Sequence, residues 1–271
     1  MYSQPIDRLH PGCILLLVDQ SASMQESFGG RAQTKADALA QAVNRLIRNL
    51  VLQCQRGEEV RDYYHVGILG YGKTVGPVLG GSLAGQHLVP VSLMADYPLR
   101  MTTEVLPGTD VSVELPVWID PKADGGTPMT AAIDLAGSII VEWANHNLDS
   151  FPPIVVNISD GFATDGDPRS IAAQLRQIRT SDGNLLLFNI NLSTEALTPI
   201  EYPNSPVHLP NPYAVGLFEM SSELTPFMMA VARGMDLPVG NGARGFVFNA
   251  DPAKLSEFLD VGTRVSQVTD R

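Results

Sequence analysis

Five oxygen-bearing side chains, far apart in this 271-residue chain, have the types and spacing that could do chemistry. They offer carboxylate or hydroxyl oxygen and neither nitrogen nor sulfur: Asp19, Ser21, Ser23, Thr127 and Asp160. Hard divalent cations select such donors, and Mg²⁺ takes about six oxygens in an octahedral array. The sequence therefore predicts a site for Mg²⁺, with Mn²⁺ or Ca²⁺ as alternatives. Each of the five residues also has a purely structural interpretation, as a cap or a turn residue.

The elements predicted around these residues bring them to one place. Asp19 follows an apolar run at 13–18 and Asp160 follows another at 154–158, and both runs are typical of strands buried on both faces. Thr127 lies just before a predicted helix. Ligands of open parallel sheets bind in the crevice at the carboxyl ends of the strands. We therefore expect both carboxylates to point into one crevice.

The rest of the chain continues this alternation of strands and helices. Further apolar runs predict strands at 63–72, 185–190 and 245–250, and helices are expected to begin near positions 34, 129, 168, 226 and 252. This order predicts one α/β domain over residues 1–271. Its sheet is expected to be Rossmann-like, doubly wound and mostly parallel, with helices on both faces.

Two segments interrupt the alternation. Residues 73–125 are rich in Gly and Pro and contain short alternating pieces, which predicts an antiparallel edge hairpin and a β-rich insertion. Residues 193–225 carry several prolines, which predicts a long connection without regular structure. Because this Pro-rich loop follows the carboxyl end of a strand, we expect it to overhang the crevice and to form part of a recognition surface.

The motifs that carry the five residues resemble a known metal site. Asp19-x-Ser21-x-Ser23, the Gly-Thr-Pro-Met sequence around Thr127 and the Ser-Asp-Gly sequence around Asp160 occur in this order along the chain. Together they resemble the metal-ion-dependent adhesion site of von Willebrand factor type A (vWA) domains. The resemblance covers nearly the whole chain, and the two interrupting segments are additions to it.

The resemblance implies the vWA fold and a cation held directly by the hydroxyls and partly through water by the aspartates. One coordination position is then open to an Asp or Glu of a partner protein. A looser similarity to intracellular bacterial vWA proteins associated with tellurite resistance implies an adaptor in a stress-response or signalling complex. Kinases, phosphatases and AAA+ ATPases are the partners that this similarity implies.

We accordingly predict a non-enzymatic, metal-dependent protein-binding module. A hydrolase that uses the same cation is an alternative, although no His lies within the motifs to act as a base. A nucleotide-binding protein is a second alternative, because residues 67–74 match the phosphate-loop pattern G-x-x-x-x-G-K-[ST] with Lys73 and Thr74 as contacts. That mechanism needs a helix N-terminus directly afterwards, and a Val-Gly-Pro sequence follows instead.

The composition limits the class of protein. A hydrophobic fraction of 44% with 17% charged residues excludes disorder for most of the chain. The net charge of −11 argues against a nucleic-acid partner, because phosphate binding depends on Lys and Arg. No apolar run approaches the ~20 residues of a membrane span, and the first residues do not resemble a signal peptide. Cys13 and Cys54 form no disulfide framework, which favours a reducing compartment and a cytoplasmic location.

Overall fold

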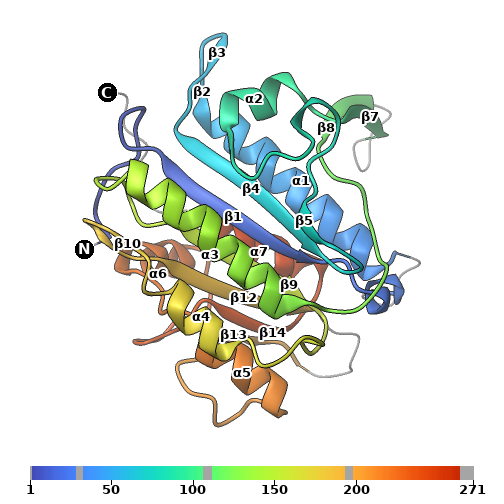
Figure 1. Ribbon diagram of the computed structural model, residues 1–271, viewed down its shortest axis with the longest axis vertical. Helices are drawn as coiled ribbons and strands as arrows, with labels where there is room; N and C mark the ends of the chain where they lie inside the picture. Colours follow the sequence, from blue (N-terminus) through green and yellow to red (C-terminus); the bar gives the residue numbers. More distant parts are fainter. Residues whose placement is uncertain (1, 29–32, 106–111, 193–197, 263–271) are drawn as a thin grey trace.

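An eight-stranded sheet lies at the centre of the computed structural model, which describes residues 2–28, 33–105, 112–192 and 198–262 (Figure 1). Its five long strands pair in parallel throughout. They are β1 (Gly12–Asp19), β4 (Tyr64–Tyr71), β9 (Ile154–Ser159), β12 (Leu186–Leu192) and β14 (Phe246–Ala250). Short antiparallel strands pair with β4 and β14, namely β5 (Val75–Pro77), β6 (Val89–Pro90) and β13 (Ile200–Glu201).

The strand order shows where a ligand site is expected. From one edge the sheet runs β5-β4-β1-β9-β12-β14, so the chain first builds outward from β1 on one side and later on the other. This is the 3-2-1-4-5-6 order of doubly wound α/β folds, in which the crevice lies where the order reverses. Here the reversal falls between β1 and β9. The predicted α/β fold class, with a mostly parallel sheet and an antiparallel edge hairpin, is confirmed.

Helices cover both faces of the sheet, and Figure 1 shows α3 in front of it and α1 behind it. One hydrophobic core joins the sheet to α1 (Lys35–Cys54), α2 (Val91–Asp96), α6 (Pro226–Gly234) and α7 (Pro252–Gly262). A second core joins it to α3 (Met129–His146), α4 (Arg169–Leu175) and α5 (Pro212–Met220). None of the helices in the described part of the chain has both the length and the apolar character that a membrane span requires.

The β1 strand shows why a continuous apolar run is needed at the sheet centre. Successive side chains of a strand point to opposite faces. Leu16 and Val18 accordingly lie in the α1-side core, whereas Leu15 and Leu17 lie in the α3-side core. Because both faces are covered, every residue of β1 is buried.

The long helix α1 begins as its sequence predicts. The Thr34 hydroxyl accepts the backbone N–H of Asp37 at 3.1 Å, and the Asp37 carboxylate accepts the Thr34 N–H at 3.0 Å. This reciprocal capping box satisfies two of the donors that the first turn leaves unpaired. It also fixes Lys35 as the first helical residue, which matters for the site described below.

The two interrupting segments are more ordered than predicted. Within 73–125, β5 forms the expected edge hairpin with the preceding strand β4, and β7 (Arg100–Val105) pairs with β8 (Ser112–Val117) outside the central sheet. The same segment also contains the helix α2, which the prediction of a β-rich insertion did not include. Two further small hairpins join β2 (Gln55–Arg56) to β3 (Glu59–Val60) and β10 (Arg179–Thr180) to β11 (Gly183–Asn184).

The prediction that 193–225 lacks regular structure was wrong. Residues 193–197 lie outside the described residues, but α5 occupies Pro212–Met220. Pro212 is the first residue of this helix, where a missing N–H costs nothing and the fixed φ favours helix. The Asn211 side chain caps it by accepting the Ala214 N–H at 2.8 Å. The prolines of this segment therefore include one that begins a helix, in addition to those in the loop.

The packing of His65 in β4 predicts a pH dependence of stability. Its Nδ1 accepts a hydrogen bond from Trp143 Nε1 at 2.9 Å, and burial lowers the pKa of His65 while Asp62 acts in the opposite direction. The buried, neutral form of His65 therefore stabilises the fold. Because its folded-state pKa lies below the unfolded value of about 6.5, this contribution is fully present above pH 6.5 and is lost as the pH falls through the folded-state pKa. Urea unfolding at pH 7.5 and pH 5 should show a larger loss for the wild type than for His65→Gln. Equal losses in the two proteins would contradict it.

Candidate metal centre

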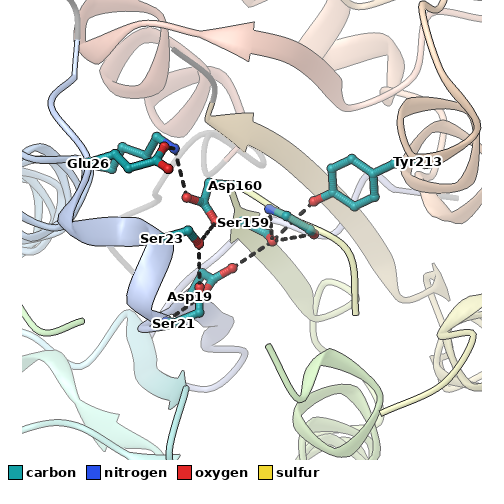
Figure 2. A network of polar contacts seen from close by, with 9 residues as sticks. Asp19, Ser21, Ser23, Glu26, Ser159, Asp160 and Tyr213 are labelled. Atoms are coloured by element: carbon teal, nitrogen blue, oxygen red, sulfur yellow. Dashed lines mark hydrogen bonds and ion pairs between the residues drawn. The ribbon is translucent and has the colours of Figure 1, made fainter. Parts of the chain in front are cut away.

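Four of the five predicted ligands lie where the strand order reverses. Asp19 is the last residue of β1 and Asp160 directly follows β9, and these two strands are neighbours with Val18 opposite Ile158. Ser21 and Ser23 lie on the short 3₁₀ turn that follows β1. Figure 2 shows these four side chains pointing toward one another at the carboxyl end of the sheet.

Hydroxyl groups link the two carboxylates. Ser23 Oγ donates to Asp160 Oδ1 at 2.8 Å and lies 3.0 Å from Ser21 Oγ. On the other side, Asp19 Oδ1 accepts the Ser21 backbone N–H at 2.8 Å, and Asp19 Oδ2 accepts the Ser159 hydroxyl at 2.8 Å (Figure 2). The D-x-S-x-S segment thus forms a turn that is closed by the Asp19 side chain. It places four oxygen-bearing side chains within one hydrogen-bonded network.

Thr127 reaches this region through its backbone. The Ala22 N–H donates to the Gly125 carbonyl at 3.0 Å, which holds the loop before Thr127 beside the serine turn. Thr127 N–H donates to Thr164 Oγ1 at 3.0 Å, and Thr164 N–H donates to Thr127 O at 2.9 Å. Thr127 is buried between the loops that follow β1 and β9. Among the described residues, no hydrogen bond joins its side chain to the other four.

Burial makes the ionised carboxylate of Asp19 costly, and a bound cation would offset that cost. Asp19 is fully buried, and burial raises its pKa to about 6, although hydrogen bonds from Ser21 and Ser159 oppose the shift and Asp160 adds to it. A buried carboxylate is costly unless it is paired or coordinates a metal. The surrounding donors are oxygens, and no group of three or more His, Cys, Asp or Glu side chains suited to a metal occurs in the described part of the chain. The donor set fits a hard cation such as Mg²⁺ or Mn²⁺ and does not fit a softer metal.

Lys35 is a member of the network that the sequence reasoning missed. Its Nζ lies 2.9 Å from Asp160 Oδ2 and 2.7 Å from Glu26 Oε2. The side chain is only 5% exposed. Burial lowers the pKa of Lys35, but hydrogen bonds to Glu26 and Asp160 outweigh this effect and the pKa is raised. One signal was present, because Lys35 stands four residues before Leu39 and therefore on the apolar face of α1.

Tyr213 is the second residue that the prediction missed, because its segment was expected to be a loop. Its hydroxyl donates to Ser159 Oγ at 3.1 Å, so α5 contacts the same serine that donates to Asp19 (Figure 2). The Tyr213 ring packs on Phe162, with centroids 4.6 Å apart, and Phe162 is 62% exposed. These two rings line a cavity of about 350 Å³ between α5 and the loop after Asp160. An apolar surface therefore adjoins the candidate metal site.

The phosphate-loop pattern at 67–74 does not have the structure that nucleotide binding needs. Its first residues lie inside β4, and the strand β5 begins at Val75 where a helix would be required. Lys73 is exposed and lies 3.6 Å from Asp124. Gly67 is explained by packing, because a Cβ at this position would meet the His87 carbonyl oxygen at 2.1 Å.

No protein-family model matches the chain, and no curated protein matches it either. Among solved structures, it is similar to the vWF domain of the type V pili tip protein Mfa5 from Porphyromonas gingivalis. The identity is 13%, the TM-score is 0.35, and the match covers 57% of this chain and 39% of that chain. For the ArnB paralog VWA2 from Sulfolobus acidocaldarius the identity is 16% and the TM-score 0.37, and the match covers 69% of this chain and 36% of that chain. For the manganese-loaded TRAP protein of Plasmodium vivax the identity is 14% and the TM-score 0.33, and the match covers 67% of this chain and 57% of that chain.

Two of the similar structures are thus named as a vWF domain and a VWA protein. This chain spans between 36% and 57% of the length of these three structures. Identities and TM-scores this low carry no argument about what the chain binds. The fold therefore stands on the strand order and register of the chain itself.

Proposed function

We propose that the chain is a non-enzymatic protein-binding module that holds a divalent cation, Mg²⁺ or Mn²⁺, with Asp19, Ser21, Ser23, Thr127 and Asp160. One observation carries the proposal. Two carboxylates that lie 141 positions apart (160 − 19) are linked by serine hydroxyls in the crevice where the strand order reverses. When bound, the cation would supply a Lewis-acidic centre that an Asp or Glu of a partner protein can join.

The residues around the crevice favour binding over hydrolysis. A hydrolytic reaction needs a base beside the attacking water. Burial raises the pKa of Tyr213 well above its ordinary value, and Lys35 is held as a cation by two carboxylates. No histidine contacts the network within the described ranges. In this proposal Asp19 and Asp160 are committed to the cation, and of the other groups described here Tyr213 and Lys35 are unsuited to take a proton from water.

The biological setting of the proposal rests only on the resemblance of the motifs. It is a cytoplasmic adaptor role beside a kinase, a phosphatase or an AAA+ ATPase in a bacterial stress-response complex. The test is affinity capture from the source cells with immobilised protein, in Mg²⁺ and in EDTA, using wild type and Asp19→Ala. Asp134→Ala, an exposed change on α3, is the control. We expect partners that are retained in Mg²⁺, released by EDTA and absent from Asp19→Ala. An identical set under all conditions would contradict the proposal.

The exposed ring of Phe162 is expected to contribute to partner binding. It lies two residues after Asp160, and exposed aromatic side chains beside a polar anchor are frequent binding determinants. Phe162→Ala should weaken binding of a captured partner about tenfold, with unchanged Mn²⁺ affinity, as measured by calorimetry. Leu148→Ala removes another exposed apolar side chain beyond the opposite end of α3 and should have no effect. Equal effects of the two substitutions would show that Phe162 has no special role.

A further inference from the structure

The buried ammonium group of Lys35 occupies one of the two carboxylates that the proposed cation needs. Asp160 uses Oδ1 to accept the Ser23 hydroxyl and Oδ2 to accept Lys35 Nζ, and its side chain is completely buried. With Asp19 and Asp160 each at −1 and Lys35 at +1, the inner site carries −1 instead of −2. Among these three buried groups a divalent cation therefore meets only half of the charge that would neutralise it, and the Glu26 carboxylate, which is 57% exposed, lies outside the buried set.

We infer that Lys35 is a tethered counter-ion that competes with the divalent cation for Asp160, and that when the cation binds it gives up Asp160 and keeps its existing contact with Glu26. This inference rests on the proposed function and adds a regulation to the same site. Repulsion between the ammonium and the incoming cation across one carboxylate is strong, because the pair lies in a buried region of low dielectric constant.

Glu26 already pairs with the ammonium and can hold it without Asp160. Its carboxylate lies 2.7 Å from Lys35 Nζ and its side chain is 57% exposed. The backbone keeps the two residues adjacent, since Lys35 N–H donates to Glu26 O at 3.0 Å and Ser27 bridges to Thr34. A displaced ammonium therefore stays paired near the surface and is not left as an isolated buried charge. The four-carbon stem of lysine has the flexibility for this movement.

A purely structural role of Lys35 makes the opposite prediction. If the ammonium only held Asp160 in place for the metal, its removal would loosen a ligand and weaken metal binding. If it competes, its removal strengthens binding. The sign of the change in affinity therefore separates the two roles.

The test measures Mn²⁺ binding, by electron paramagnetic resonance of free Mn²⁺, in wild type, Lys35→Met and Glu26→Gln. Methionine keeps an unbranched side chain and removes the charge. We expect Lys35→Met to bind Mn²⁺ at least about tenfold more tightly. Glu26→Gln should bind about threefold to tenfold more weakly, because the displaced ammonium loses its partner. Arg45→Met is the control, since it removes an ion-paired cation from the exposed side of the same helix and should leave the affinity unchanged.

Thermal unfolding supplies a second readout. Without metal, Lys35→Met should be less stable than wild type, because Asp160 is left buried without a cation. Saturating Mn²⁺ should raise its melting temperature more than that of the wild type, because the ion replaces the missing charge. An equal shift in both proteins would contradict the competition.

The outcomes separate this inference from the proposed function. Unchanged or weaker Mn²⁺ binding in Lys35→Met overturns the competition, while binding that is lost in Asp19→Ala still supports the metal site. Absence of Mn²⁺ binding in both wild type and Lys35→Met overturns the proposed function itself. Binding in Lys35→Met alone supports the inference. If Lys35→Met does not fold, Glu26→Gln decides, and an unchanged or tighter affinity there overturns the retention of the ammonium by Glu26.

Discussion

Replacing Asp19 by alanine is expected to weaken Mn²⁺ binding by at least about 100-fold, because even residues that only orient a metal ligand contribute about 10- to 100-fold. The charges in the crevice make this the most damaging single change. Within the described residues Asp19 makes no ion pair, whereas Asp160 is paired with Lys35. Without Asp19, the remaining carboxylate that accepts a serine hydroxyl in the described part of the site is Asp160, which is paired with an ammonium group. A divalent cation then meets Asp160 and Glu26 with one ammonium shared between them, which is half of the net negative charge that it meets in the wild type.

Electron paramagnetic resonance of free Mn²⁺ measures the affinity, and the melting temperature gives an independent check. A ligand at 100 times its dissociation constant stabilises the folded state by about 2.7 kcal/mol. Mn²⁺ should therefore raise the melting temperature of the wild type and of the Asp134→Ala control, and leave that of Asp19→Ala unchanged. If Asp19→Ala binds Mn²⁺ as tightly as wild type, the cation does not lie between β1 and β9.

Those features of the site that depend on strand ends could be predicted from the sequence. Asp19 and Asp160 each follow an apolar run, and parallel strands bring their carboxyl ends to one edge of the sheet. The pairing of β1 with β9 could not be predicted in this way, since it depends on which way the chain turns after β4. The hydroxyl contacts of Ser23 required that pairing, because its partner Asp160 is 137 residues away.

The features that the sequence did not reveal share a different cause. Lys35 has the spacing of a buried position, but the partner that makes its burial tolerable comes from another strand end. Tyr213 lay in a segment whose prolines indicated a loop, although Pro212 occupies the one helical position that favours proline. Thr127 is a middle case, because its loop is where the motif predicts it and its side chain makes no hydrogen bond to the other ligands among the described residues. In all three cases the position of the side chain depends on tertiary contacts, which the local sequence pattern does not determine.

Replacing Asn157 by leucine is expected to lower the free energy of unfolding by about 3 kcal/mol, because buried polar groups that lose a partner cost about 1–3 kcal/mol each. Asn157 and Asn189 are polar residues inside two largely apolar strands, and they lie opposite each other in the register of β9 and β12. Tyr71 donates to Asn157 Oδ1 at 2.7 Å, and Asn157 Nδ2 donates to Asn189 Oδ1 at 3.0 Å. All three side chains are completely buried.

This buried series of hydrogen bonds extends across the sheet under the candidate metal site. Tyr71 is the register partner of Asp19, and Asn189 Nδ2 donates to Ser221 Oγ, just after α5, at 3.0 Å. Asn157 connects the two halves, so leucine would leave Asn189 Oδ1 without this donor and Tyr71 without its 2.7 Å partner, while the Ile158 carbonyl at 3.2 Å remains. Urea unfolding measures the loss. A loss below about 0.5 kcal/mol, as for surface substitutions, would mean that the asparagine pair is not coupled to stability.

A double-mutant cycle with Tyr71→Phe separates the hydrogen bond from the change in packing. In the wild type the Tyr71 hydroxyl is satisfied by Asn157, so its removal costs stability. In the Asn157→Leu background the same hydroxyl lacks its shorter partner, and its removal should then cost little or even stabilise. We expect a coupling energy of about 1 kcal/mol or more, since contacting residues in one network are non-additive. Additive effects would instead assign the whole loss to the shape of leucine, and the polar chain would then contribute no specific stabilisation to the crevice above it.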